Sequence, residues 1–152
     1  MTDPGIKIEL LKDCFRILDD RIASARAGMM EAQEAANSET KGSAGDKHET
    51  GRAMMQIERD KHARMYYDAM EEKKILSAID IATPSSIVNP GTLVLTDYGN
   101  FFISLGVGRI HAGPLQAIAI SIQSPLGRGL SGRMAGNTVS FNGRNYIIRE
   151  IV

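Results

Sequence analysis

The sequence predicts two domains, a long antiparallel helical hairpin followed by a small α+β domain. Apolar residues repeat with heptad spacing through the first quarter of the chain. Charge is uneven, because residues 1–80 hold 13 Lys/Arg and 16 Asp/Glu whereas residues 81–152 hold 5 and 2. The second half is instead rich in glycine and in short β-branched runs between turn residues. We therefore expect a hairpin over 1–80, a linker over 81–86 and an α+β domain over 87–152.

Composition limits the function classes. A net formal charge of zero over 152 residues argues against a protein that coats bare nucleic acid. The single cysteine, Cys14, excludes an internal disulfide and a cysteine-rich zinc site. The first residues mix charges throughout, and no apolar run approaches the roughly 20 residues that a membrane helix needs. We expect a soluble cytoplasmic protein with no membrane partner.

The first helix is expected to begin at about residue 6, after Pro4 and Gly5. From there to Ala36 only Gly28 weakens the helix. Apolar side chains follow at alternating spacings of four and three, as in a coiled-coil seam. These residues are Leu11, Phe15, Leu18, Ile22, Ala25, Met29, Ala32 and Ala36.

A second helix is expected from about Arg52 to Ile79, after a turn-rich tip loop over about 37–51. Glu58 and Glu72 interrupt its apolar face, which consists of Met55, His62, Met65, Ala69, Leu76 and Ile79. Because one helix cannot bury a seam alone, pairing within an antiparallel hairpin is the simplest solution, with arms of roughly 40–45 Å. A dimerisation coiled coil is the alternative.

The second half predicts a mostly antiparallel sheet with one short helix. Expected strands cover 92–96, 101–105, 115–122, 139–141 and 146–151, with hairpin turns at 97–100 and at Asn142-Gly143. Residues 106–113 are rich in glycine and are expected to form a turn. Ser124 as N-cap and Pro125 at the first helical position predict a short helix after them.

Asp46 and Glu49 are the candidate functional residues at the hairpin tip. They are three residues apart, so they can point the same way if the chain is helical there. Such a pair can ligate a hard cation such as Mg²⁺, mimic phosphate toward a basic pocket, or stabilise the start of the second helix. His48 between them can transfer protons or be a solvated polar group, whereas His62, His111 and Cys14 are expected to be structural.

Residues 120–139, together with 146–151, closely resemble the end of the Gre family of transcript cleavage factors. The shared pattern is a strand, Ser-Pro, Arg between small residues, Leu, Gly-Arg and a strand pair. The tip Gly45-Asp46-Lys-His-Glu49 resembles the Gly-Asp-x-x-Glu tip of the same family. The order of the two domains also matches, so the resemblance implies that the C-terminal domain is FKBP-like.

The resemblance also implies a mechanism. Gre-like proteins dock at the rim of the secondary channel of RNA polymerase, and their hairpin reaches the catalytic centre and the nascent RNA. Asp46 and Glu49 become acids that assist, in trans, a Mg²⁺ shared with the polymerase, and no cofactor is expected on the isolated protein. Ser124 and Pro125 become rim contacts, and the chain is not itself an enzyme.

Three functions are consistent with these residues. The first is an elongation factor that stimulates cleavage of backtracked RNA. The second is a non-cleaving regulator that occupies the same channel, because Thr50-Gly51-Arg52-Ala53 replaces the family's usual Asn-Ala-Glu-Tyr. The third, an FKBP-like chaperone or prolyl isomerase, is disfavoured by the small number of aromatic residues.

Overall fold

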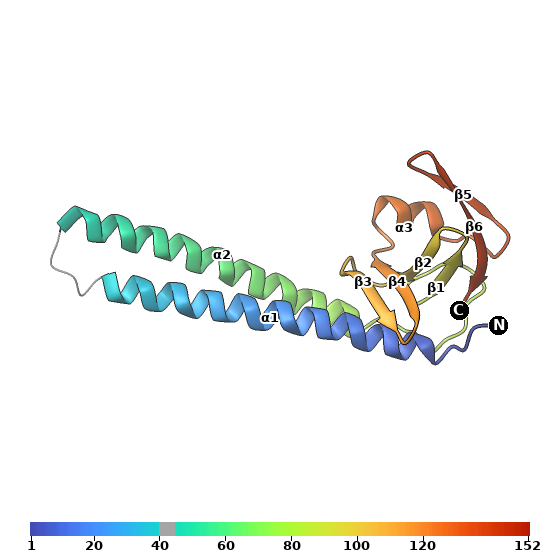
Figure 1. The fold of residues 1–152 in the computed structure, drawn as a ribbon, viewed down its shortest axis with the longest axis horizontal. Coiled ribbons are helices and arrows are strands. Elements are labelled where there is room, and N and C mark those ends of the chain that lie inside the picture. The colour runs from blue at the N-terminus through green and yellow to red at the C-terminus, as the bar shows by residue number, and fades with distance from the viewer. Residues whose placement is uncertain (40–44) are drawn as a thin grey trace. The chain divides into compact units, whose positions relative to one another are not determined.

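The computed structural model describes residues 1–39 and 45–152, as well as the side chains of all of them except 39 and 45–48 (Figure 1). Two long helices come first, and a six-stranded sheet with one short helix follows. The elements are α1 (Ile6–Glu39), α2 (Gly45–Ser77), β1 (Leu93–Thr96), β2 (Gly99–Ile103), β3 (Gly108–Ala112), β4 (Leu115–Ile120), α3 (Pro125–Leu130), β5 (Thr138–Phe141) and β6 (Arg144–Ile151). Within the described residues, no helix has the length and apolarity that crossing a membrane requires.

The chain forms two compact units. The hairpin unit comprises Leu18–Lys74, and the sheet unit comprises Met1–Ile17 together with Ile75–Val152. The first three turns of α1 thus belong with the sheet. The division into 1–80, 81–86 and 87–152 stays a prediction about which segments fold independently.

The two helices of the hairpin unit run antiparallel. Lys73 Nζ lies 2.7 Å from Asp19 Oδ1, and Arg59 Nη1 donates to Gln33 Oε1 at 2.8 Å. Between these two contacts the residue number on α1 rises by 14, from 19 to 33, while the number on α2 falls by 14, from 73 to 59. The predicted antiparallel hairpin is confirmed, and within this chain the seam of α1 is covered by α2.

The seam of the hairpin unit is narrow and lined by small residues. On α1 the buried seam residues of this unit are Leu18, Ala25, Ala32 and Ala36. On α2, His62 and Ala69 are seven residues apart and face α1, and Ala69 is buried. Met65 lies three residues after His62 and is 50% exposed. Met65, which the sequence places on the apolar face of this helix, is therefore only partly covered.

Gly28 and His62 fit together across this seam. A Cβ added at Gly28 would lie 2.6 Å from His62 Nδ1, so only glycine leaves space for the imidazole ring. The helix penalty of Gly28 is therefore offset by packing. His62 has a packing role, as the sequence suggested.

The helices continue further toward the tip than the sequence analysis expects. Residues 37–39 belong to α1, and α2 begins at Gly45 instead of Arg52. The expected loop over 37–51 is therefore too long. Polar residues cost a helix only tenths of a kcal/mol each, and acids in the first turn of α2 favour the helix there.

The sheet has the order β3-β4-β2-β1-β6-β5. All neighbouring strands are antiparallel except the parallel pair β2 and β4, so the predicted mostly antiparallel α+β domain is confirmed. Asn142 and Gly143 have φ of 50° and 72°, as a two-residue hairpin turn between β5 and β6 requires.

The expected turn over 106–113 is wrong, because residues 108–112 form β3, which pairs antiparallel with β4. Its burial alternates, with Ile110 and Ala112 buried and Arg109 and His111 exposed. Glycines on both flanks conceal this short edge strand in the sequence.

The sheet has two distinct sides. One side forms a core with α3 that includes Phe101, Ile103, Leu130 and Ile148. Phe102, between Phe101 and Ile103, is fully buried on the opposite side.

The first turns of α1 are bonded to the sheet. Lys7 Nζ donates to the Gly91 carbonyl at 3.1 Å, and Asp13 Oδ2 accepts from the His111 N–H at 2.8 Å. Leu10 and Cys14 are consequently the fully buried residues here, whereas Leu11 and Phe15 of the expected seam are only half-buried.

The reactivity of the Cys14 thiol provides a test of the packing of α1 on the sheet. Burial raises the pKa of this thiol to about 11, and a hydrogen bond with Ser104 opposes that shift. We expect the folded protein to react slowly with iodoacetamide at pH 8 and rapidly once denatured.

Because the folded pKa lies above the unfolded value, the stabilisation from Cys14 is complete below about pH 9 and declines above it. Denaturant titrations of the wild type and Cys14→Ala at pH 7 and pH 10 measure this; equal pH dependence of the two proteins would contradict it.

Candidate functional site at the hairpin tip

The start of α2 extends beyond the end of α1. Arg59 lies opposite Gln33. Six residues further along α1, Glu39 therefore lies opposite Ala53 in the same antiparallel register. Residues 45–52 of α2 lie past the register position of Glu39, the last described residue of α1, and at about 1.5 Å per residue they span roughly 12 Å of helix. Asp46 and Glu49 both belong to this segment.

The N-terminus of α2 suits acidic residues. Asp46 occupies the first turn, Glu49 follows one turn later, and Glu49 is exposed. The positive end of the helix dipole stabilises the ionised form of carboxyls placed there. The side chains of Asp46 and His48 lie outside the described residues, so only the backbone positions of these two residues define this part of the site. Stabilisation of the helix start is thus one role that their position gives these acids, and ligand binding stays a prediction.

The donor set at the tip fits Mg²⁺ only in part. Carboxylate oxygens are ligands that Mg²⁺ prefers, but two carboxylates leave most of an octahedral shell to other ligands. Among the residues whose side chains the structure describes, 1–38 and 49–152, no three His, Cys, Asp or Glu residues gather closely enough to hold a metal ion. By their chemistry the two acids fit Mg²⁺ only as two contributors, and the remaining ligands would have to come from another molecule.

Ser124 and Pro125 open α3 as the sequence predicts. Ser124 is the N-cap: its Oγ accepts from the Gly127 N–H at 3.1 Å and donates to the Ser121 carbonyl at 2.7 Å. A Cβ at Gly127 would lie 2.1 Å from that carbonyl, so glycine is required by the turn. The motif Ser-Pro-Leu-Gly is thus a structural unit, and within it Pro125 is exposed.

Comparisons with known proteins give one likeness. No protein-family profile matches the chain, and no curated protein matches it. Among solved structures, the chain is similar to the crystal structure of GreA factor homolog 1 (Gfh1) protein of Thermus thermophilus, with a TM-score of 0.35 and 17% sequence identity. The similarity covers 89% of this chain and 92% of that chain.

Proposed function

We propose that this chain is a transcription factor of the Gre type that binds RNA polymerase and stimulates cleavage of backtracked RNA. The observation that carries the proposal is the position of Asp46 and Glu49, on the part of α2 that extends beyond α1. A thin helical hairpin with its acids at the free end is suited to delivering carboxylates into a channel. The Gre-like pattern of residues 120–139 supports the choice of partner.

The chemistry belongs to the polymerase, and this chain completes its site. Mg²⁺ supplies charge stabilisation for an in-line displacement at the RNA backbone. Asp46 and Glu49 would provide carboxylate ligands for it and accept hydrogen bonds from the attacking water, which orients that water.

The sheet unit would provide the docking contact. Under this proposal it is FKBP-like and binds the rim of the secondary channel through Ser124 and Pro125. Ser124 would act mainly by fixing the backbone, because its hydroxyl is already bonded on both sides. Pro125 is exposed and can contact the partner directly.

A second candidate is a regulator that occupies the channel without stimulating cleavage. The segment Thr50-Gly51-Arg52 favours it, because an exposed cation three residues after Glu49 lies one helical turn away on the same side. Such a cation could pair with the carboxylate and compete with a metal ion for it.

One experiment separates the two candidates. Purified protein is added to backtracked elongation complexes in Mg²⁺ buffer, and polymerase binding and release of short 3′ RNA fragments are both measured. Fragment release above that of polymerase alone supports the cleavage factor. Binding with no added release favours the non-cleaving regulator. Absence of binding to core polymerase contradicts both.

A further inference from the structure

Several exposed side chains share the α3 side of the sheet. Ile118 is paired with Phe101 across the parallel strands β4 and β2, and Arg109 is paired with Ile118 across β3 and β4. Side chains opposite one another in register lie on the same side. Since Phe101 belongs to the core under α3, Arg109 and Ile118 lie on that side too.

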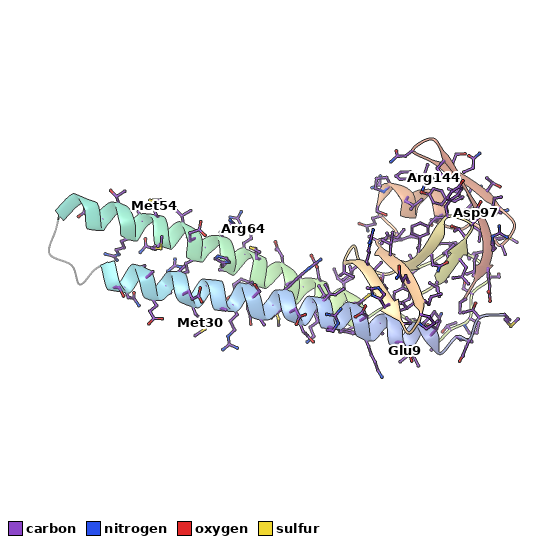
Figure 2. All side chains as sticks on the ribbon, in the orientation of Figure 1. Glu9, Met30, Met54, Arg64, Asp97 and Arg144 are labelled. Atoms are coloured by element: carbon purple, nitrogen blue, oxygen red, sulfur yellow. The ribbon has the colours of Figure 1, made fainter. Side chains whose placement is uncertain are left out.

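A second group on this side is linked to the same core. The Phe101 and Tyr146 rings meet edge to face at 5.8 Å between centroids, and Tyr146 meets Tyr98 in the same way at 6.1 Å. The guanidinium carbon of Arg144 lies 4.7 Å from the centroid of the Tyr98 ring. Arg144 is the first residue of β6 and is labelled in Figure 2. Tyr98, in the turn between β1 and β2, and Arg144, at the start of β6, thus lie on the side that carries Arg109 and Ile118 on β3 and β4.

The short helix α3 leaves both ends of this side open. Six strands span roughly 24 Å, whereas a six-residue helix is about 9 Å long and 10 Å wide. Accordingly Ile118 is 42% exposed and Tyr98 is 55% exposed. Arg109 and Arg144 are exposed as well.

The segment that forms this side has a net positive formal charge. Residues 81–152 contain five arginines and two acids. Asp97 and Glu150 are these two acids, so the segment has three more arginines than acids. A partner on this side therefore meets the exposed Arg109 and Arg144 on a segment of net positive formal charge.

The composition is that of a protein-binding surface. Tyrosine and arginine dominate binding energy at protein interfaces, and the stacking of Arg144 on Tyr98 restricts the guanidinium before binding. Bases of single-stranded nucleic acid instead need free aromatic faces to stack on. The Tyr98 ring has one face under Arg144 and also packs against Tyr146.

We propose that the α3 side of the sheet is a docking surface for an acidic protein segment, anchored by Arg109 and Arg144 around the apolar Ile118 and Tyr98. The inference rests on the proposed function in one respect: the segment belongs to RNA polymerase. It extends the docking contact well beyond Ser124 and Pro125.

The test measures the affinity of the full chain for bacterial core RNA polymerase at low salt. The variant Arg109→Glu/Arg144→Glu is expected to bind at least about tenfold more weakly than the wild type, and Ile118→Ser about threefold more weakly. Lys12→Glu, at an exposed position on α1 of the same unit, is the control for a charge reversal elsewhere, with half the charge change of the double variant, and should stay within about twofold. Melting curves of all variants accompany the binding data, and Arg109→Gln/Arg144→Gln replaces the double variant if its folding is impaired.

The outcomes separate the two proposals. If the wild type binds and the double variant binds equally well, the docking surface is overturned while the proposed function stands. If the wild type does not bind polymerase, the proposed function fails, and the polymerase segment fails with it as the partner. Binding of a single-stranded RNA oligonucleotide that is lost in the double variant would overturn the assignment to a protein partner.

Discussion

Replacing Asp46 and Glu49 together by alanine is expected to lower factor-stimulated cleavage of backtracked RNA by about 100-fold. Loss of groups that support a metal site typically costs 10–100-fold in activity. Polymerase affinity should stay within about twofold, because the docking contacts of the sheet unit are untouched. The measurement is the rate of 3′ fragment release at saturating factor, with affinity determined separately.

The matched control is Glu31→Ala/Glu34→Ala. These two acids have the same spacing and lie exposed on α1, away from the tip. This variant changes the charge of the hairpin by the same amount and should cleave within about twofold of the wild type. Equal losses in the two double variants would show that the hairpin acts through its overall charge and would contradict a specific role for the tip.

The substitution Gly91→Ala is expected to destabilise the sheet unit by more than about 3 kcal/mol. Gly91 has a φ of +94°, and a Cβ there would lie 1.9 Å from the carbonyl oxygen of Asp80. The backbone cannot shift easily, because the Gly91 N–H donates to Ile103 and its carbonyl accepts from the buried Lys7 ammonium. Burial lowers the pKa of Lys7, and nearby Asp80 partly offsets that shift. Because the Lys7 ammonium donates to the Gly91 carbonyl, a displaced turn would also weaken this buried hydrogen bond.

Denaturant titration of the full chain measures this loss. Gly113→Ala is the matched control, because Gly113 also has a positive φ, of +59°, but open space around its Cβ position. It should cost only about 1 kcal/mol, the price of the backbone conformation alone. Similar losses at both positions would show that the close approach to Asp80 contributes little.

Local pattern was enough to predict the hairpin and most of the sheet. Heptad spacing gave α1 because coiled-coil packing repeats every seven residues, and Asn142-Gly143 gave a two-residue turn because both residues tolerate positive φ. Edge strand β3 was missed because three of the residues from 106 to 113 are glycines, and its pairing with β4 outweighs their low propensity. The tip loop was overestimated because the extent of the helices depends on tertiary packing as well as composition.

The candidate site divides in the same way. The acid pair at the tip and the N-cap role of Ser124 follow from short-range rules about helix starts. The fit of His62 against Gly28 and the pairing of Arg109 with Ile118 depend on register between distant segments, which no local pattern contains. The proposed docking surface of the sheet unit could be recognised only once the strand order was known.

The most direct measurement of the central claim is the Mg²⁺ dependence of RNA fragment release from backtracked complexes. If Asp46 and Glu49 contribute ligands to a Mg²⁺ shared with polymerase, wild-type factor should lower the Mg²⁺ concentration for half-maximal release by about tenfold. Asp46→Asn/Glu49→Gln should return that concentration to the value of polymerase alone while still binding polymerase. Half-maximal release at one Mg²⁺ concentration for polymerase alone, the wild type and the variant would contradict the claim.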